Sequence, residues 1–385
     1  MKTSKITALY ISNDDRVMAG ASHSLYNMIQ SVKESVEPVV LVAETGQAYD
    51  FFSNHGVECI IAPFLQLYYF VNDRNPITRR LRYVKHIYDF ERAEDNCAKV
   101  VAETLKGRNV KIVHSNSTIM TVGIKIARRL GAKHVWHVRE FLDADFHIEP
   151  FRGRKRLNSQ VWQADATIAI TRQIYSHWHL DKCRRSYTMW NAVRSLSEVC
   201  YDEAKENYFL FCCARLSDNK GADFAVECFG KSGLARKGYL LKIIGICSET
   251  YRRKLDVIAN QYGCNEQVIY LGYQTDVKPF MSKARAFLMT SLNEGMGRTT
   301  VEAMFFGCPV IARHSGGTVD FMRDKRTGFF FDTDEQCVKL MKQMACETPT
   351  GVILSAQELA RTSFSEEAYG EKLLQIYHKV LNDEK

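Results

Sequence analysis

The stretch from Asn293 to Asp320 reads NEGMGRTTVEAMFFGCPVIARHSGGTVD. It follows the apolar run 286–289 (AFLM), which is typical of a buried strand, and it enters a helix pattern after the turn 295–297 (GMG). A strand, a glycine-containing turn and a helix together present free backbone N–H groups and the positive end of the helix dipole, which favour a phosphate. The stretch therefore predicts an open α/β sheet with an anion site at the carboxyl end of its strands.

Two carboxylates in this stretch, Glu294 and Glu302, are separated by seven residues. Glu294 is expected on the loop that leaves the strand, and Glu302 about one turn inside the helix. Placed on either side of a bound diphosphate, each carboxylate can accept hydrogen bonds from hydroxyl groups. A nucleotide-sugar has this shape, because sugar hydroxyls lie at one end of its diphosphate and ribose hydroxyls at the other.

A second strand and glycine loop follow at once. The apolar run 309–312 (PVIA) leads into the loop 314–317 (HSGG), where glycines allow a ligand to approach the backbone closely. Two consecutive strand ends with such loops favour a ligand site in a crevice. A dinucleotide-binding turn is the alternative, but Thr300 stands where the third glycine of that fingerprint would be.

Length and composition describe a two-domain globular protein. The chain has 385 residues, more than one hydrophobic core usually holds, and it is 46% hydrophobic and 25% charged. No apolar run approaches the ~18 residues of a membrane span, and the first residues do not resemble a signal peptide, so we expect a cytoplasmic protein. The net charge of +8 permits an acidic partner or a membrane surface, and it does not call for nucleic acid. The twelve cysteines form no Cys-x-x-Cys pair and are expected to be reduced, buried thiols.

Strand-like runs alternate with helix patterns along the whole chain, which predicts parallel sheets covered on both faces. The alternation pauses around Asn191, so we expect two Rossmann-like α/β domains, residues 1–192 and 193–365, with parallel sheets facing a central cleft, followed by a helical segment, 366–385. The expected strands are 6–11, 38–43, 59–62, 110–114, 134–138, 166–170, 208–213, 240–245, 268–272, 286–289 and 309–312.

Arg215 and Lys220 lie on the loop after the first strand of the second half. Two cations at the carboxyl end of a strand can neutralise a diphosphate leaving group as its bond to a sugar breaks. The alternative is a solvated basic loop.

His114 and His137 begin the polar segments 114–117 (HSNS) and 137–140 (HVRE), each at the end of a first-half strand. There they are expected to face the cleft and bind an acceptor hydroxyl or the transferred sugar; a structural hydrogen-bonding role is the alternative. The pair His177 and His179 is expected to lie on the surface or in packing rather than to bind a metal.

Asp143 and Asp145 have the Asp-x-Asp spacing by which a different transferase architecture holds a divalent cation. No companion ligand is evident in the sequence, so no metal site is predicted.

The segment 74–88 carries five cations and no acidic residue before Asp89, and it follows the aromatic run 64–70 (FLQLYYF). One interpretation is peripheral contact with an anionic membrane surface and a lipid-linked acceptor. The other is a solvated helix face beside a buried strand.

The second half resembles the donor-binding domain of glycosyltransferase family 4, retaining enzymes of the GT-B architecture. The first half resembles the family only loosely, through 20–22 (GAS) and the two histidine segments. The matching pieces are 214–216 (ARL) with 220–221 (KG), 271–273 (LGY), 294–297 (EGMG), 302–304 (EAM), 307–312 (GCPVIA), and 316–317 (GG) with Asp320.

The resemblance implies a nucleotide-sugar donor, a glycan or lipid-linked acceptor, no metal cofactor, and a final helix that crosses back to the first domain. It places Glu294 near the sugar hydroxyls and Glu302 near the ribose, with Arg215 and Lys220 on the diphosphate. Met296 and Arg298 depart from the family's usual residues beside the sugar pocket. The implied catalytic residues are Glu294, Arg215, Lys220, His114 and His137, and the implied donor-binding residues are Gly20, Arg215, Lys220, Tyr273, Glu294, Gly295, Met296, Gly297, Arg298, Thr299 and Glu302.

Two other functions remain open on the sequence. A nucleotide-sugar epimerase or isomerase of the same architecture would change the donor without an acceptor. A dinucleotide-dependent oxidoreductase is disfavoured by Thr300 and by the paired glutamates.

Overall fold

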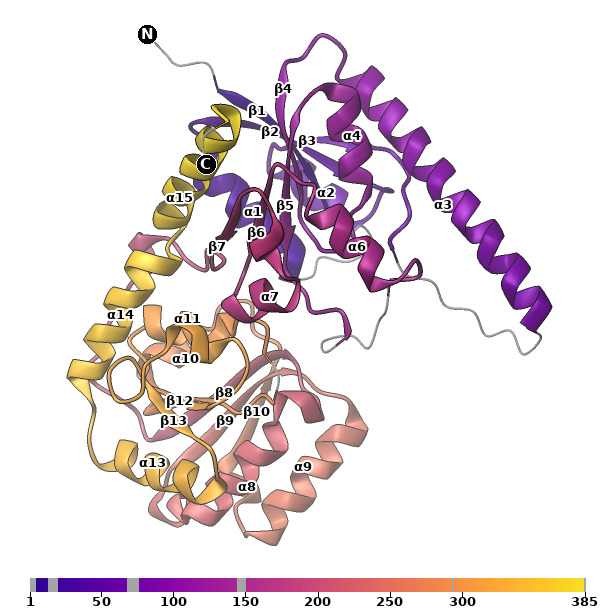
Figure 1. Ribbon diagram of the computed structural model, residues 1–385. Helices are drawn as coiled ribbons and strands as arrows, with labels where there is room; N and C mark the ends of the chain where they lie inside the picture. The colour runs from indigo at the N-terminus through magenta and orange to yellow at the C-terminus, as the bar shows by residue number, and fades with distance from the viewer. Residues whose placement is uncertain (1–4, 13–19, 68–75, 144–149, 293, 384–385) are drawn as a thin grey trace. The chain divides into compact units, whose positions relative to one another are not determined.

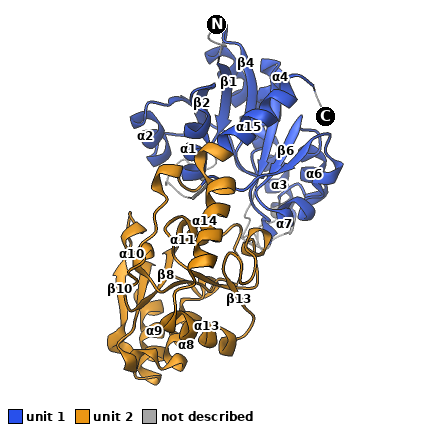
Figure 2. Ribbon diagram, turned by 90° about the vertical axis from the view of Figure 1, so that its left-hand side faces the viewer, with its two compact units in different colours: residues 1–192, 369–385 blue, residues 193–368 orange. Residues whose placement is uncertain are grey.

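The computed structural model describes residues 5–12, 20–67, 76–143, 150–292 and 294–383 (Figure 1). The chain divides into two compact units (Figure 2). Unit 1 comprises Met1–Ala192 with Tyr369–Lys385, and unit 2 comprises Val193–Ala368. Each unit is built on one sheet whose recorded strand pairs are all parallel.

The sheet of unit 1 has seven strands in the order β3-β2-β1-β4-β5-β6-β7. Its strands are β1 (Ile6–Ile11), β2 (Val36–Val42), β3 (Glu58–Ile61), β4 (Val110–Ser115), β5 (Lys133–Val138), β6 (Ala166–Ala169) and β7 (Ser186–Thr188). Its helices are α1 (Gly20–Val32), α2 (Gln47–Asn54), α3 (Pro76–Thr104), α4 (Val122–Leu130), α6 (Arg154–Val161), α7 (Arg172–His177) and most of α15 (Glu366–Leu381).

Side-chain alternation along β1 and β4 divides the core of unit 1 into two layers. Tyr10 and Ile112 point to the face that α1 and α15 cover, and Leu9 and Val113 point to the face that α3 and α4 cover. The apolar face of α15 lies in the first layer, where Gly370 lets the helix approach α1: a Cβ there would be 2.1 Å from the backbone oxygen of Ser31. The α15 side chains buried in this layer are Tyr369, Leu373, Ile376, Tyr377 and Val380.

The sheet of unit 2 has six strands in the order β10-β9-β8-β11-β12-β13. Its strands are β8 (Tyr208–Arg215), β9 (Leu240–Ile246), β10 (Val268–Gly272), β11 (Ala286–Met289), β12 (Val310–Arg313) and β13 (Phe329–Phe331). Its helices are α8 (Ala222–Ser232), α9 (Glu249–Gln261), α10 (Lys278–Lys283), α11 (Arg298–Phe305), α12 (Thr318–Phe321), α13 (Asp334–Cys346) and α14 (Thr350–Phe364).

In both sheets, the order in which strands are added reverses at one point. In unit 2 the chain runs outward from β8 to β10 and then returns to place β11 on the other side of β8. Loops at the carboxyl ends of two such strands leave in opposite directions, so a crevice opens between them at this topological switch point.

The prediction of two Rossmann-like domains with parallel sheets is confirmed. The predicted strands agree with the observed ones to within two residues at each end, as for β2, which begins at Val36 rather than at residue 38. The sequence reading missed β7 and β13, two edge strands of three residues each. Within the described ranges, no helix has both the length and the apolarity to cross a bilayer.

Candidate functional site

Lys220 and Glu294 meet at the switch point of unit 2. Lys220 ends a short 3-10 turn after β8, and Glu294 follows β11. The Lys220 Nζ donates to Glu294 Oε2 at 2.7 Å, and the two side chains are 34% and 21% exposed. The structure therefore brings together a cation and a carboxylate that are 74 residues apart in sequence, at the place where a parallel sheet binds ligands.

The loop that carries Lys220 is fixed to the end of β11. Gly221 has a φ of 73°, and a Cβ there would lie 2.5 Å from the backbone oxygen of Thr290. The Thr290 hydroxyl donates to the Gly221 oxygen at 2.7 Å, and the Leu292 N–H donates to the Asn219 oxygen at 3.0 Å. A residue with a side chain would be strained at position 221, so glycine is required for this close approach.

The loop that carries Glu294 packs against the glycines after β12. The Gly317 N–H donates to the Glu294 backbone oxygen at 2.6 Å. A Cβ on Gly317 would lie 2.0 Å from the Gly295 oxygen, and one on Gly316 would lie 2.7 Å from the Glu294 nitrogen. These contacts hold the backbone of the loop in place, and Met296 is buried beneath it.

Glu302 lies one turn inside α11, as predicted, and pairs with Arg194. The Arg194 Nη2 donates to Glu302 Oε1 at 3.0 Å, and the Glu302 side chain is only 13% exposed. Among the described residues, no hydrogen bond is recorded to Oε2 of Glu302. Arg194 was not predicted as a site residue. The sequence feature that could have indicated it is its position directly after the domain boundary.

Two buried hydroxyl groups, one from α11 and one from α12, lie beside Gly297. Thr300 and Thr318 are at most 1% exposed, and their Oγ1 atoms have no hydrogen-bond partner within the part of the chain that the structure describes. Both are close to Gly297, which has a φ of 79° and where a Cβ would lie 2.9 Å from Thr318 Oγ1. Buried hydroxyls normally have a partner, so these two are suited to a ligand or ordered water.

Four other predicted donor residues lie on β8, on α11 and after β10. Arg215 is exposed at the end of β8, and Thr299 and Arg298 begin α11. Burial lowers the pKa of the Arg298 guanidinium, while Glu302 raises it and Arg194 lowers it. Tyr273 follows edge strand β10 and is 58% exposed, with β9 between its strand and the switch point.

His114 and His137 are enclosed rather than open as expected, and their contact with an acceptor or a sugar stays a prediction. Both side chains are fully buried in unit 1. His114 Nδ1 lies 2.7 Å from the Tyr377 hydroxyl of α15, and His114 Nε2 lies 3.3 Å from His137 Nδ1. The reason is strand alternation, because His114 shares its face with Ile112 beneath α15. Burial lowers the pKa of both imidazoles well below the ordinary value, so both are neutral at neutral pH.

The polar residues after these strands bind one another. The Arg139 Nε donates to Asn116 Oδ1 at 2.9 Å, and the Thr118 hydroxyl donates to Glu140 Oε2 at 2.7 Å. They join the ends of β4 and β5 and are a structural network. Gly20 is the first residue of α1, and the residues before it lie outside the described ranges, so its role in donor binding stays a prediction.

Asp143 forms an ion pair with Arg154 and also contacts His177. Its Oδ2 lies 2.5 Å from Arg154 Nη1, and its Oδ1 lies 3.1 Å from His177 Nε2. Asp145 lies outside the described residues. Across the described ranges, no group of three or more His, Cys, Asp or Glu side chains is arranged to hold a metal ion.

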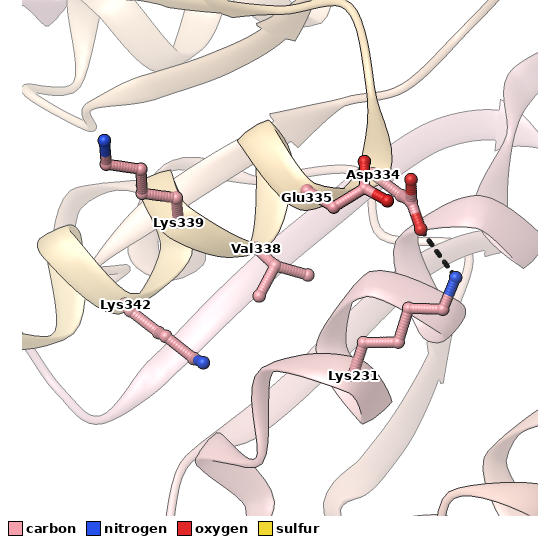
Figure 3. A pocket seen from close by; sticks show the side chains of 6 residues that line it. All are labelled: Lys231, Asp334, Glu335, Val338, Lys339 and Lys342. Carbon is pink, nitrogen blue, oxygen red and sulfur yellow. Dashed lines mark hydrogen bonds and ion pairs between the residues drawn. The ribbon is translucent and has the colours of Figure 1, made fainter.

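A hollow of about 510 Å³ lies elsewhere in unit 2, between α8 and α13 (Figure 3). Lys231 and Asp334 form an ion pair of 2.6 Å at its edge. None of the predicted site residues lines it, so it is separate from the switch-point site. Its lining residues are Lys231, Asp334, Glu335, Val338, Lys339 and Lys342.

Part of unit 2 matches the model of a known protein family. Residues 200–349 match the model of the family described as "Glycosyl transferases group 1". The match begins before β8 and ends after α13, so it includes Lys220, Glu294 and Glu302. This part of unit 2 is therefore similar to the group 1 glycosyl transferases.

Curated relatives match over parts of their length. Over 195 residues, 50% of this chain and 56% of the relative, the chain is 27% identical to the lipopolysaccharide core biosynthesis glycosyltransferase LpsE of Rhizobium meliloti. Over 122 residues, 28% of this chain and 29% of the relative, it is 30% identical to the human alpha-1,3/1,6-mannosyltransferase ALG2. The chain thus spans less than two thirds of the length of these relatives.

The fold matches a solved structure over nearly the whole chain. HepE from Anabaena, solved in complex with UDP, superposes with a TM-score of 0.76 and covers 98% of this chain and 100% of its own. At 15% identity this likeness shows the fold alone. The two Rossmann-like domains are those of the GT-B architecture.

Proposed function

We propose that this protein is a retaining glycosyltransferase that moves a hexose from a nucleoside-diphosphate sugar to a glycan or lipid-linked acceptor in polysaccharide or glycolipid biosynthesis. The observation that carries the proposal is the Lys220–Glu294 pair at the switch point, inside the segment that matches the group 1 family. The names of LpsE and ALG2, and the UDP bound to HepE, support the same class of reaction.

The site must first bind the negatively charged diphosphate of the donor. Lys220 and Arg215 supply two positive charges at the carboxyl end of β8, where a diphosphate would lie. As the bond from the sugar to the diphosphate breaks, negative charge grows on the leaving oxygen, and fixed cations stabilise that charge more strongly than they stabilise the bound donor. The N–H groups at the start of α11 add to this stabilisation.

The two glutamates would orient the ends of the donor. Glu294 can accept hydrogen bonds from sugar hydroxyls with its Oε1 while its Oε2 pairs with Lys220. Glu302 can accept from ribose hydroxyls with Oε2 while Arg194 holds Oε1. In this account both carboxylates bind and position the donor, and neither acts as a general acid or base.

Retention requires the acceptor to attack from the face that the diphosphate leaves. The acceptor oxygen forms its bond to the anomeric carbon while the bond to the diphosphate breaks. The acceptor's proton passes to an oxygen of the departing diphosphate. In this account the acceptor's proton does not pass to the buried His114 or His137.

We also propose that no metal ion is needed, since Arg215 and Lys220 provide the positive charge that a divalent cation supplies at other diphosphate sites. Turnover in the presence of EDTA should equal turnover without it. Loss of activity with EDTA, followed by recovery with Mn²⁺, would show instead that a metal takes part and would direct attention back to Asp143 and Asp145.

A donor panel tests the reaction class. The purified chain is incubated with UDP-, GDP- and ADP-sugars, with and without a mixture of glycan and lipid-linked acceptors, and the released nucleotide and the product's anomeric configuration are measured. Acceptor-dependent release with retained configuration is the expected result. An altered sugar without nucleotide release would establish the epimerase or isomerase alternative, and an inverted product would refute the retaining mechanism.

A further inference from the structure

Helix α3 carries apolar side chains on two different faces. In its second half, Cys97 and Val101 are buried in the core of unit 1, and Phe90 at its middle is buried beside Phe151. In its first half, four large apolar residues are exposed: Ile77 (72%), Leu81 (66%), Val84 (58%) and Tyr88 (64%). Figure 1 shows that the first turns of α3 extend beyond the edge of the sheet.

The four exposed residues form one stripe. At about 100° per residue, positions 77, 81, 84 and 88 fall within roughly 60° of one another on the helix surface. Phe90 and Val101 lie about 130–150° away from the middle of this stripe. The stripe is therefore not a continuation of the core-facing side of α3. We refer to Ile77, Leu81, Val84 and Tyr88 as the α3 stripe.

Positive charge surrounds the α3 stripe. Arg80 and Lys85 are exposed and lie on opposite sides of it, at roughly 60–80° from its centre. The sequence from 77 to 88 also contains Arg79 and Arg82 and has no acidic residue. A narrow apolar stripe between cations is typical of helices that lie in the interface of a membrane containing anionic lipids.

We propose that the first three turns of α3 bind peripherally to an anionic lipid bilayer, with the α3 stripe in the acyl boundary and Arg80 and Lys85 at the lipid phosphates. Tyr88 fits this placement, because its ring is apolar and its hydroxyl reaches the headgroup level. In the aromatic run before the helix, Phe64 is buried in the core, and residues 68–70 lie outside the described ranges.

Charge is the reason to infer a lipid surface rather than a protein groove. A peptide-binding groove would recognise the apolar residues, but it would not require cations on both sides of the stripe. Anionic headgroups supply negative charge on both sides at once, and each cation near such a surface strengthens binding several-fold. The inference does not depend on sugar transfer.

Vesicle co-sedimentation of the full chain tests the proposal. Phosphatidylcholine vesicles with and without phosphatidylglycerol are compared, at low and high salt. The wild-type chain should bind the anionic vesicles, bind neutral ones at least about tenfold more weakly, and lose affinity as salt rises.

Two variants separate the apolar and the charged contributions. Leu81→Glu/Val84→Glu should weaken binding to anionic vesicles about tenfold or more, whereas Val100→Glu/Val257→Glu, which places the same charges at two other exposed apolar positions, should not. Arg80→Gln/Lys85→Gln should weaken binding by a similar factor, and Lys339→Gln/Lys342→Gln, with the same change in net charge on α13, should leave it unchanged.

Three outcomes would overturn the proposal. They are no binding to anionic vesicles, binding that the α3 variants do not weaken more than their matched controls, and concentration-dependent self-association through the α3 stripe in place of lipid binding. Circular dichroism of each variant shows that it is folded. Donor turnover in solution, measured in parallel, should be the same in all four variants, so failure of this proposal is distinct from failure of the proposed reaction.

Discussion

The Lys220 ammonium and the Glu294 carboxylate lie 2.7 Å apart, one from each of the two strands that flank the switch point of unit 2. In this arrangement the carboxylate positions the cation before a ligand binds. Under the proposed function, a diphosphate that enters the crevice would give Lys220 a second anionic partner, and the lysine would already be in place when the donor arrives.

Replacing Lys220 with alanine should lower the rate of sugar transfer at least tenfold, about 1.4 kcal/mol or more, because one of the two charges on the leaving group is lost. Lys231→Ala is the matched control, since Lys231 also pairs with a carboxylate of unit 2 but lies in the hollow away from the site (Figure 3). Steady-state kinetics on both folded variants provide the measurement. Equal rates for Lys220→Ala and the wild type would remove Lys220 from the mechanism.

Arg194→Ala should weaken donor binding more than it slows turnover. The change leaves the nearly buried Glu302 carboxylate without its guanidinium partner, so the carboxylate is no longer held toward the ribose. We expect the KM for the donor to rise about fivefold or more, with partial recovery in Arg194→Lys. Arg252→Ala, which breaks an exposed ion pair on α9, serves as control. A change in kcat alone would argue against this positioning role.

Gly317→Ala should destabilise unit 2, because its Cβ would lie 2.0 Å from the Gly295 oxygen and would push apart the two loops that hold Glu294. A loss of about 2 kcal/mol or more is expected, together with a loss of donor binding. Gly351→Ala in α14 meets no atom within 4 Å and should be neutral or stabilising. Urea titrations of both variants measure the difference, and equal stabilities would show that the loops are less closely packed than described.

Unit 1 should lose stability as the pH falls below about 6.5, the ordinary pKa of histidine. Burial lowers the pKa of His114 and His137 well below that value, so the unfolded chain takes up protons that the folded chain does not, and unfolding becomes more favourable. Both histidines contribute to this loss in the same direction. His114→Gln should reduce the pH dependence of the unfolding free energy. An unchanged dependence would contradict the buried, neutral state.

Most of the fold was predictable because its signals are local. Apolar runs between polar loops mark the central strands, and the 3.6-residue spacing of Tyr369, Leu373 and Ile376 marks one face of α15. The edge strands β7 and β13 give no such signal, because each has three residues and pairs with one neighbour only. The loop position of Glu294 and the helical position of Glu302 also followed from local sequence.

The parts of the site that were missed depend on contacts between distant residues. Arg194 and Glu302 are 108 residues apart, and no local pattern connects them. The strand position of His114 was correctly predicted. Its side chain is enclosed because it points to the face of the sheet that α15 covers, and the sequence of the strand does not show which face that is. Alternation shows that the side chains of a strand point to two faces of the sheet, but it does not show which helices cover each face.

Calorimetric titration with UDP, GDP and ADP tests the central claim most directly, since that claim is that the Lys220–Glu294 site of unit 2 binds the diphosphate of a nucleotide-sugar. At least one nucleotide should bind the wild-type chain with one site per chain. The same nucleotide should bind Lys220→Ala about tenfold or more weakly, and it should bind Lys231→Ala as well as it binds the wild type. Absence of binding by all three nucleotides, or equal affinity for the wild type and Lys220→Ala, would contradict it.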